Sequence, residues 1–461
     1  MFIGRKKELE YLNDLYNTDK FQFPVIYGRR RVGKTALINE FAKDKDTIYF
    51  TAIETNEKQN LENFSSSIFQ YTDKSKIAPV FSSFQEALEY VFELSKMKRL
   101  ILVIDEYPYV AKSSRELSSV LQMLIDKNKD TSKMFLILCG SSMSFMENQV
   151  LGYQSPLYGR RTAQFKINPF DFFESRNYFK KLSNIDIATI YGIVGGTPQY
   201  LLQMSDDLSV EDNIKKNILN PLSYLFEEPI NLLKQEVREP NKYNAIISAI
   251  ATGSSKLSEI SSKVSEETSA CSAYLNNLIS LGLVKKETPF LEKVSKRTIY
   301  SIEDNLFRFW YRFIPANISI IQNEMIELAY ENIERQLSSY MGAVFEQICK
   351  QYLWKLNKKG KAAFTFTKLG RWWGNDPRNR CETEIDIICV DEDKSAIFCE
   401  CKWTNEKVDN IVLDTLIDRS KLFHYTTLFY YVFSKSGFTK GIIDNALKMG
   451  NVTLIEFEEM L

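Results

Sequence analysis

The sequence predicts a multidomain α/β protein with a parallel sheet, a helical lid, a winged helix-turn-helix and a second, smaller α/β domain. The length of 461 residues corresponds to roughly three packed units. Short apolar strand patterns alternate with helical patterns near the start of the chain and again after Gly342. Hydrophobic residues make up 44% and charged residues 26%, as in ordinary soluble proteins, which excludes a wholly disordered or collagen-like chain.

The distribution of apolar residues argues against a membrane protein. The longest aliphatic runs, 100–104 and 135–139, are far shorter than the roughly 20 residues that a membrane helix needs. The first residues are charged and contain no apolar stretch typical of a secretory signal. We therefore expect a cytoplasmic protein without a membrane partner.

Cysteine, histidine and charge restrict the chemistry. The seven cysteines form no CxxC pair, which argues against a zinc ribbon or a disulfide framework. Because His424 is the only histidine, multi-histidine metal sites are excluded and any histidine-dependent triad would need that residue. Catalysis must therefore use carboxylates, lysine, arginine and hard metal ions. Lysine plus arginine equals aspartate plus glutamate at 59 each, so nucleic-acid binding would need local basic patches.

A glycine-rich segment follows the first buried strand pattern, at 23–27, and precedes a helical pattern. It matches GxxxxGK[ST], in which Gly28 and Gly33 let the backbone curl so that N–H groups point at a phosphate. We expect Lys34 to reach the β- and γ-phosphates of ATP and Thr35 to bind Mg²⁺. A glycine turn before a helix is the plain alternative. The expected nucleotide contacts in this segment are Gly28, Arg29, Arg30, Arg31, Val32, Gly33, Lys34, Thr35 and Ala36.

A second strand pattern, at 100–104, ends in Asp105 and Glu106. We expect Asp105 to bind Mg²⁺ through water and Glu106 to orient the attacking water as general base, although such acidic pairs also occur as solvated charge. A third strand pattern, at 135–139, leads to Ser141 at the sheet edge where ligands gather in α/β folds. Ser141 or Ser142 is a candidate γ-phosphate sensor, and a helix N-cap is the alternative for either serine.

Two further segments add a family resemblance. Residues 2–9, FIGRKKEL, resemble the FxGRxxEL box that precedes the P-loop in AAA+ and STAND NTPases. Residues 105–110, DEYPYV, resemble the Walker B motif of the archaeal-type ATPases in that group. The resemblance implies an ATPase core in which the first box lies near the adenine.

Two more motifs fit the same resemblance. Residues 195–198, GGTP, resemble the GxP motif that packs on the base in STAND proteins, which implies that Pro198 contacts the nucleotide. Residues 157–161, LYGRR, resemble the arginine segment of the family, which makes Arg160 or Arg161 a candidate phosphate-sensing arginine. Bonding of these arginines to carbonyls or carboxylates is the alternative.

The middle of the chain has the order of a winged helix. Three short helical patterns after Asn241 precede a hairpin pattern. The helix expected to enter a DNA groove carries no arginine or lysine, which argues against base reading and favours a relay role between domains over DNA binding. The aromatic-rich stretch 305–314, closed by Pro315, looks like a docking segment, and we interpret its aromatic stripe at helical spacing as core packing. A helix is expected to follow, to about Gln336. The basic residues of the hairpin, which could contact phosphates, are Lys285, Lys286, Lys293, Lys296 and Arg297.

The C-terminal pattern combines three carboxylates with a lysine. Glu346 lies on a predicted helix and Asp386 on a predicted strand, while Glu400 and Lys402 share one face of the next strand. Carboxylate oxygens suit Mg²⁺, and an ammonium beside them suits phosphodiester chemistry. Cross-strand charge pairs on a solvated face are the alternative. The elements predicted here are a helix at 345–356, strands at 362–367, 384–390, 396–403 and 427–433, and a helix at 406–423.

This order resembles the PD-(D/E)xK nuclease superfamily, specifically the DUF234-type domain that follows archaeal-type ATPases. The resemblance implies a restriction-endonuclease-like fold, with Glu346, Asp386 and Glu400 as Mg²⁺ ligands and Lys402 as a catalytic residue. The motif's proline is absent, since Glu384 and Ile385 precede the aspartate. A loop predicted to enter this sheet holds candidates for gripping DNA or stacking on a base, namely Arg371, Trp372, Trp373, Arg378 and Arg380.

The leading hypothesis is an ATP-dependent switch that gates Mg²⁺-dependent DNA cleavage. The alternative is a regulatory ATP-binding protein whose C-terminal domain binds DNA or a protein partner without cutting, and a second copy of the chain is a further possible partner. A sequence-specific transcription regulator would need the neutral helix to read one site. The expected domains are an ATPase core at 1–165, a helical lid at 166–238, a winged helix at 239–304, a helical linker at 305–339 and a nuclease-like domain at 340–461.

Overall fold

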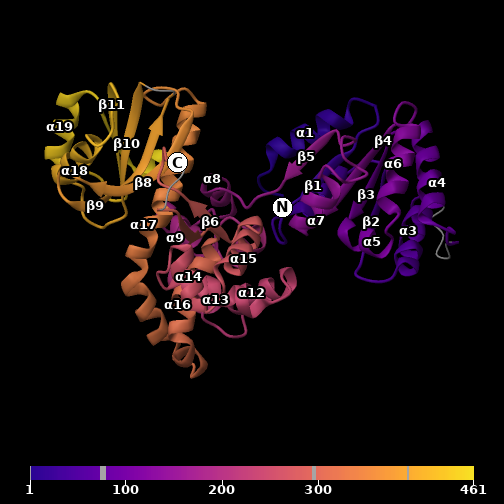
Figure 1. Ribbon diagram of the computed structural model, residues 1–461, viewed down its shortest axis with the longest axis horizontal. Helices are drawn as coiled ribbons and strands as arrows, with labels where there is room; N and C mark the ends of the chain where they lie inside the picture. Colours follow the sequence, from indigo (N-terminus) through magenta and orange to yellow (C-terminus); the bar gives the residue numbers. More distant parts are fainter. Residues whose placement is uncertain (1, 73–78, 293–296, 392–393) are drawn as a thin grey trace. The chain divides into compact units, whose positions relative to one another are not determined.

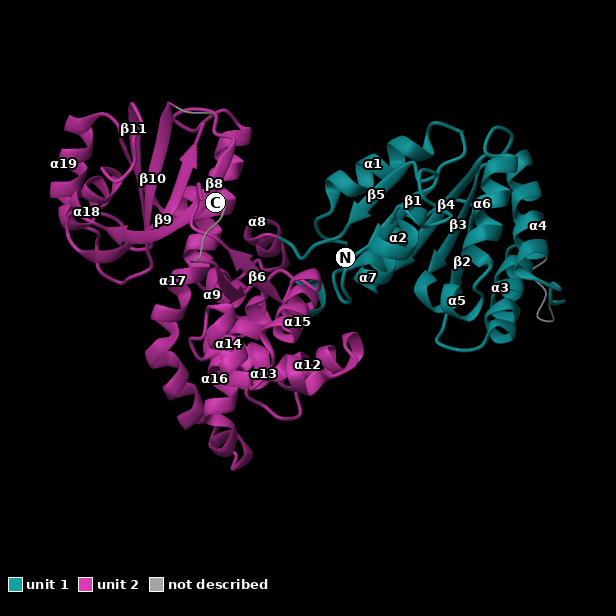
Figure 2. Cartoon of the chain, in the orientation of Figure 1, with its two compact units in different colours: residues 1–170, 197–199 teal, residues 171–196, 200–461 magenta. Residues whose placement is uncertain are grey.

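The computed structural model describes residues 2–72, 79–292, 297–391 and 394–461. These residues form two compact units, drawn in two colours in Figure 2. The first unit holds residues 1–170 and 197–199, and the second holds residues 171–196 and 200–461. Within the described part of the chain, no helix is both long and apolar enough to cross a membrane.

The first unit contains a five-stranded, wholly parallel sheet with strand order β2-β3-β4-β1-β5 (Figure 1). The three inner strands are buried at every position, which agrees with their continuous apolar sequences. Because all strands run the same way, their carboxyl ends meet at one edge. The strands are β1 (Pro24–Tyr27), β2 (Thr47–Thr51), β3 (Leu100–Asp105), β4 (Met134–Gly140) and β5 (Ala163–Lys166).

Helices cover both faces of this sheet (Figure 1). On one face, α1 and α2 pack through Leu12 and Phe41 against Phe135 of β4. On the other face, α3 to α6 pack through residues such as Phe64 and Leu121. The helices are α1 (Lys6–Tyr16), α2 (Lys34–Ala42), α3 (Glu57–Thr72), α4 (Phe84–Met97), α5 (Tyr107–Ser113), α6 (Leu117–Asn128) and α7 (Met143–Phe145), which a π-helical turn (Met146–Val150) extends.

The second unit begins with helices and a two-stranded antiparallel hairpin. The hairpin and three helices before it share a core that includes Ile247, Ile260, Leu275 and Tyr300. The order of three helices and a hairpin is the one that the sequence predicted. The elements are α8 (Phe172–Ser175), α9 (Asn184–Val194), α10 (Pro198–Leu201, which begins in the first unit), α11 (Val210–Asn217), α12 (Tyr224–Glu236), α13 (Pro240–Ala251), α14 (Leu257–Val264), α15 (Thr268–Ser280), β6 (Val284–Glu287) and β7 (Ile299–Ile302).

Two long helices, α16 (Asn305–Gln322) and α17 (Ile326–Lys358), follow the hairpin. The prediction that Pro315 closes the first of them is wrong, because α16 continues through the proline. Proline removes one backbone hydrogen bond, at a cost of about 3 kcal/mol. Asn317 and Ile321, both buried, continue the buried face of the helix beyond Pro315, and Asn317 Nδ2 donates to the carbonyl oxygen of Phe313 at 2.9 Å. This packing and hydrogen bonding offset the loss.

The C-terminal sheet is mixed, with strand order β12-β11-β10-β9-β8. Strands β8, β9 and β10 pair antiparallel, whereas β10, β11 and β12 pair parallel. A parallel P-loop-type sheet and a second, mixed-sheet domain therefore confirm the α/β multidomain prediction at this level. The elements are β8 (Lys368–Asp376), β9 (Cys381–Val390), β10 (Ser395–Lys402), α18 (Asn410–Ser420), β11 (Thr427–Ser434), α19 (Lys440–Met449), β12 (Val452–Glu456) and a 3₁₀ turn (Phe457–Met460).

The predicted position of the first strand of this sheet is wrong. Residues 362–367 form no strand, and β8 instead contains Arg371 and both tryptophans, which were expected in a loop. Phe366, one of the apolar residues that suggested a strand at 362–367, instead packs on Trp354 of α17. Residues 368–376 become a strand because they pair with β9 over nearly their whole length, with an irregularity between Gly370 and Trp372.

Gly140, the last residue of β4, lies too close to Pro108 for a larger side chain. A β-carbon at Gly140 would lie 2.8 Å from Pro108 Cδ, and the proline ring cannot rotate away. We expect Gly140→Ala to lower the free energy of unfolding by about 1–3 kcal/mol, measured by urea unfolding. The matched control is Gly342→Ala in α17, where a β-carbon meets no atom within 4 Å. That change should stabilise the protein by up to about 1 kcal/mol, and equal effects of both changes would contradict the packing argument.

Candidate functional site

The loop after β1 can curl only because glycines stand at two positions. A β-carbon at Gly28 would lie 2.3 Å from the carbonyl oxygen of Ile167 on the neighbouring segment, which leaves no room for a side chain. Gly33 has a φ of 89°, in the left-handed region that favours glycine. The loop therefore holds a tight backbone arc at the carboxyl edge of the sheet.

Lys34 begins α2 and points back into this arc. Its side chain is buried, and Nζ donates hydrogen bonds to the carbonyl oxygens of Gly28 (2.8 Å) and Arg29 (3.0 Å). The ammonium therefore lies inside the loop, close to the N-terminus of α2. A cation and a helix N-terminus facing the same space form an anion site.

Asp105 lies at the carboxyl end of β3 and connects three elements. Its Oδ2 accepts hydrogen bonds from the hydroxyls of Thr35 (3.2 Å) and Tyr49 (2.8 Å), and its Oδ1 accepts one from the Glu106 N–H (2.9 Å). Burial and the nearby Asp105 charge raise the pKa of Tyr49, so its hydroxyl stays protonated and donates. The structure thus brings together Thr35 and Asp105, as expected, and adds Tyr49 from β2.

Glu106 and Ser141, the predicted general base and γ-phosphate sensor, are bonded to each other. The Ser141 hydroxyl donates to Glu106 Oε2 at 2.8 Å. Glu106 adopts a left-handed backbone conformation with a φ of 50°, which is uncommon outside glycine. This conformation directs the side chain from the end of β3 across to the end of β4.

Two motifs that are distant from the loop in the sequence contact it directly. Arg5, from the box at 2–9, donates to the carbonyl oxygens of Val32 (3.1 Å) and Asn168, so the box braces the loop backbone. From the GGTP motif, the Thr197 hydroxyl accepts a hydrogen bond of 2.6 Å from Arg29 Nη2. Pro198 also approaches the loop, since its Cγ lies 3.5 Å from the β-carbon position at Gly33.

Two further arginines of this unit, Arg160 and Arg30, form hydrogen bonds to other residues of the protein. Arg160 forms a two-pronged pair with Asp126, at 2.9 and 2.6 Å, and donates to the carbonyl oxygen of Pro156 at 2.9 Å. The hydrogen bond from Arg160 lowers the pKa of Asp126. These contacts match the alternative interpretation of the arginine segment, in which its arginines bond to carbonyl oxygens or carboxylates. A contact between Arg160 and a nucleotide stays a prediction. Arg30 donates to the Tyr109 hydroxyl at 2.8 Å.

These residues fit ATP with Mg²⁺ chemically. The arc is formed by backbone and glycines, so no side chain blocks the approach of a phosphate to its N–H groups, and its wall carries the Lys34 ammonium. The hydroxyl of Thr35 and the carboxylate of Asp105 are hard oxygens of the kind that Mg²⁺ prefers. Val32 and Ala36 frame this arc, Val32 buried and Ala36 exposed at the start of α2.

The second candidate site lies on β9, β10 and α17. Asp386 and Glu400 come from paired strands and are each only 7% exposed. Asp386 Oδ2 accepts a hydrogen bond of 2.8 Å from the Cys401 N–H, and Lys402 Nζ donates to Glu400 Oε1 at 2.7 Å. Arg419 of α18, which the sequence did not suggest, lies 3.5 Å from Glu400 Oε2.

Burial and like charge dominate the electrostatics of these carboxylates. Burial, with the added repulsion of Glu400 and Glu346, raises the pKa of Asp386 to about 8. Burial also raises the pKa of Glu346. For Lys402, burial alone would lower the pKa, but the Glu400 carboxylate outweighs it and the pKa is raised. The structure therefore places Glu346, Asp386, Glu400 and Lys402 within electrostatic reach of one another.

The carboxylate oxygens of this site are suitable ligands for a divalent cation, but the side chains are spaced too widely to bind one as they stand. Within the described residues, no three carboxylate, cysteine or histidine side chains lie close enough together to hold a metal ion. The repulsion that raises the pKa of Asp386 is nevertheless the kind of charge excess that Mg²⁺ neutralises. Binding would have to draw the carboxylates together.

Two of the three arginines expected to grip DNA, Arg371 and Arg378, pair with carboxylates within the second unit. Arg371 pairs with Glu384 on the neighbouring strand. Arg378 lies in the turn after β8 and pairs with Asp376 at 2.8 Å. Arg380 lies in the same turn, with a φ of 52°.

The β6–β7 hairpin packs on β8 and occupies several of its groups. The Phe290 N–H donates to the carbonyl oxygen of Arg371 at 2.8 Å, and Arg297 exchanges hydrogen bonds of 3.2 Å with Trp373. Lys285 pairs with Glu287 at 3.1 Å. Of the other basic residues predicted on this hairpin, Lys286 is exposed, and Lys293 and Lys296 lie outside the described residues.

Comparison with known proteins gives the class first. Residues 2–204 match an ATPase domain found predominantly in Archaea, and residues 310–412 match DUF234, a family of archaeal and bacterial proteins of unknown function. The chain thus contains an ATP-binding ATPase domain of the archaeal type, with a DUF234 region C-terminal to it. This confirms the ATPase and DUF234 parts of the resemblance.

An uncharacterized protein of Methanocaldococcus jannaschii, MJECL04, is 36% identical over 426 residues, covering 92% of both chains. The chain therefore belongs to the same family as MJECL04. An uncharacterized ATP-binding protein of that organism, MJ0423, is 51% identical over 45 residues, 10% of this chain and 76% of that protein. The Walker-type ATPase PABY2304 of Pyrococcus abyssi has the same fold, with a TM-score of 0.52, 20% identity, and coverage of 68% of this chain and 96% of that one.

The Arg29–Thr197 hydrogen bond should support ATP binding. We expect Thr197→Val, which keeps the shape and removes the hydroxyl, to weaken ATP affinity roughly three- to tenfold, because Arg29 loses the partner that fixes the loop. Isothermal titration calorimetry measures this affinity. Thr189→Val is the matched control, since the Thr189 hydroxyl bonds only within its own helix, to Ile185. Unchanged affinity in Thr197→Val would contradict the role.

Stability should depend on pH through Asp386. Because its pKa is raised to about 8, folding favours the protonated form, and this stabilisation is lost as pH rises from the ordinary range near 4 through about 8. Asp386→Asn cannot ionise and keeps an oxygen for the Cys401 N–H. We expect its melting temperature to exceed that of the wild type by more at pH 8.5 than at pH 5.5, by about 2–4 °C for each kcal/mol. An equal difference at both pH values would contradict the raised pKa.

Proposed function

We propose that the protein is an ATP-dependent switch in which nucleotide at the P-loop controls Mg²⁺-dependent cleavage of DNA by the C-terminal domain. The observation that carries the switch is the Arg29–Thr197 hydrogen bond. Residues 197–199 pack with the first unit, while the chain on both sides belongs to the second unit. A change at the P-loop is thereby linked covalently to the second unit.

In the ATPase half, the roles follow from position. Lys34, inside the loop, would bind the β- and γ-phosphates, and the loop N–H groups would hold the β-phosphate. Mg²⁺ held by Thr35 and Asp105 would supply positive charge beside the phosphates. Glu106 would orient the attacking water, and Ser141, bonded to Glu106, would connect that carboxylate to the γ-phosphate position.

In the C-terminal half, Glu346, Asp386 and Glu400 would hold Mg²⁺, which would supply charge beside a phosphodiester. Lys402 would place its ammonium near the attacked phosphate, where negative charge develops. The two buried carboxylates support this assignment, since charges on a solvated face would not be 7% exposed. This burial weighs against the interpretation as ordinary cross-strand pairs.

In this proposal, residues 239–304 act as a winged-helix relay. The packing of the hairpin on β8 supports that role over DNA binding, because the Arg297 side chain already donates to Trp373. The helices at 166–238 would form the lid that connects the ATPase core to this relay. Movement of the lid would then reach β8 through the hairpin.

A second candidate is a regulatory ATP-binding protein whose C-terminal domain does not cut. Two observations favour it: Lys402 is paired with Glu400, and Arg371 of β8 is paired with Glu384. In this candidate the domain binds DNA or a protein partner, and the carboxylates have no catalytic role.

A cleavage assay separates the two candidates. Purified protein would be incubated with circular and linear DNA, with and without Mg²⁺ or Mn²⁺ and ATP. We expect Asp386→Asn to lower cleavage roughly a hundredfold or more while ATP turnover persists, and Lys34→Ala to lower ATP affinity at least roughly tenfold and to change cleavage. The matched controls are the exposed residues Asp414→Asn and Lys43→Ala.

Each outcome assigns a function. Metal-dependent cleavage that is lost in Asp386→Asn and kept in Asp414→Asn supports the nuclease. Cleavage that changes neither with ATP nor in Lys34→Ala would contradict the switch but still support the nuclease. Intact ATP binding without cleavage of any DNA would exclude the first candidate and support the regulatory one.

A further inference from the structure

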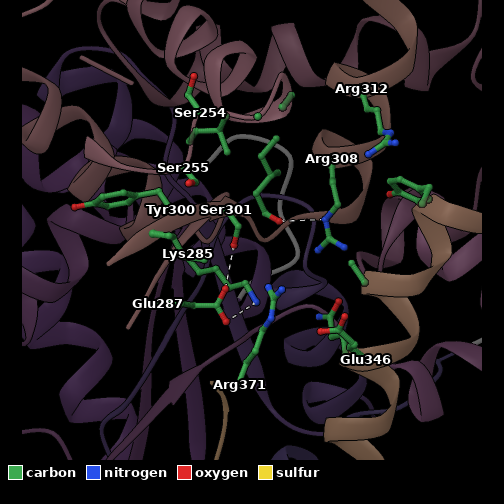
Figure 3. A pocket seen from close by; sticks show the side chains of 18 of the residues that line it. Ser254, Ser255, Lys285, Glu287, Tyr300, Ser301, Arg308, Arg312, Glu346 and Arg371 are labelled. Carbon is green, nitrogen blue, oxygen red and sulfur yellow. Dashed lines mark hydrogen bonds and ion pairs between the residues drawn. The ribbon is translucent and has the colours of Figure 1, made fainter. Parts of the chain in front are cut away.

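A cavity of about 370 Å³ lies within the second unit, and every residue that lines it belongs to that unit (Figure 3). The β6–β7 hairpin forms one wall, helices α16 and α17 form another, and Arg371 of β8 closes one side. Small-molecule sites commonly have volumes of roughly 300–1,000 Å³. The cavity is therefore large enough for a ligand of nucleotide size.

The lining of this cavity is positively charged. Two carboxylates, Glu287 and Glu346, offset only part of that charge, which leaves a formal excess of three positive charges (five minus two). Inside a partly enclosed space such an excess attracts an anion more strongly than on an open surface. The basic residues that line the cavity are Lys285, Arg308, Arg312, Lys350 and Arg371.

Some of this charge is already neutralised and some is not. Lys285 pairs with Glu287 at 3.1 Å, and Arg371 pairs with Glu384. In contrast, no carboxylate of the described residues lies within ion-pair distance, 4.0 Å, of Arg308 or Arg312. The charge of the cavity that no ion pair of the described residues compensates therefore lies at Arg308 and Arg312 on α16 and at Lys350 on α17.

The two arginines on α16 are arranged to act together. They are four residues apart, so their side chains leave the same face of the helix. Arg308 is held in place by hydrogen bonds to the carbonyl oxygens of Ile302 (3.2 Å) and Glu303 (3.4 Å). In Figure 3, the guanidinium groups of Arg312, Arg308 and Arg371 follow one another down the view, with Glu346 beside the last. Guanidinium groups that face one space are suited to phosphate oxygens.

The other part of the lining is apolar with scattered hydroxyls. Ile250, Ile299 and Ile302 supply apolar surface. Serine hydroxyls are interspersed with this surface, notably at Ser254 and Ser255, which Figure 3 shows at the end of the cavity opposite Arg371. A ligand with a charged phosphate at one end and a less polar, hydrogen-bonding body at the other would match both parts.

We propose that this cavity binds a phosphate monoester of nucleotide size, with the phosphate on Arg308, Arg312 and Lys350. The site is distinct from the P-loop and does not depend on hydrolysis of ATP there. Because Glu346 and Arg371 also line the cavity, a bound phosphate competes with Glu346 and Glu384 for Arg371. Occupancy of the cavity therefore acts on the carboxylate site of the C-terminal domain.

The test is calorimetric titration of the Lys34→Ala full-length protein, in which nucleotide binding at the P-loop is weakened, with Lys34→Ala alone as the reference for every further variant. The probes are AMP, ATP, inorganic phosphate, and a short oligonucleotide with or without a 5′-phosphate. We expect saturable binding of a phosphate monoester that weakens with salt. Arg312→Gln and Lys350→Gln, each added to Lys34→Ala, should lower the affinity at least roughly tenfold.

The matched control is Arg335→Gln on α17, whose partner Glu331 lies on the same exposed surface. It should leave binding unchanged. Arg308 is kept intact because it holds the backbone, and thermal unfolding checks that each variant folds. Binding of a free nucleotide identifies a small-molecule site, whereas binding only of the 5′-phosphorylated oligonucleotide identifies a nucleic-acid end as the source of the phosphate.

Two results would overturn the proposal: no saturable binding of any probe at millimolar concentration, or binding that both Arg312→Gln and Lys350→Gln leave intact. Failure of the ATP-switch proposal would look different. In that case, wild-type and Lys34→Ala proteins would bind ATP equally, whatever the cavity variants do.

Discussion

The parallel pairing of β1, β4 and β3 is the constraint on which the nucleotide site depends. Parallel strands deliver their carboxyl ends to one edge, and here those ends carry the glycine arc, Ser141 and Asp105. Thr35 then needs only the first turn of α2 to reach the Asp105 carboxylate. Because β4 stands between the other two strands, the Glu106–Ser141 hydrogen bond crosses from β3 to its direct neighbour. A register shift in any of these strands would separate the groups.

The second unit is governed by a different constraint, the burial of like charges. Asp386 and Glu400 lie on adjacent strands with little access to water, and they retain that arrangement because Lys402, Arg419 and the Cys401 N–H compensate part of their charge. Buried like charges lower the free energy of unfolding, and they are found more often at sites of catalysis or recognition than elsewhere. The contacts between the hairpin and β8 place the hairpin beside the strand that pairs with β9, which carries Asp386.

The sequence predicted the parts of the fold that local chemistry decides. Gly28 and Lys34 stand in a motif whose spacing leaves the backbone almost no choice, and Asp105 follows an uninterrupted buried strand. What it could not predict depends on partners distant in the chain. Strand β8 contains Gly370 and other residues with low strand propensity, and only its pairing with β9 makes it a strand. Tyr49 looks like any aromatic residue of a strand until β2 and β3 are set side by side.

The chain enters the first unit twice, since residues 197–199 return to it after an excursion of 26 residues, 171–196, through the second unit. A cut at residue 170 therefore does not separate two independent modules. A fragment of residues 1–170 would lack the hydroxyl that holds Arg29 and the ring beside Gly33, and the remaining fragment would carry them without a partner. Recombination that exchanged the N-terminal unit between relatives would meet the same obstacle. Sequence changes in the loop and in the returning segment therefore have to remain compatible for these contacts to persist.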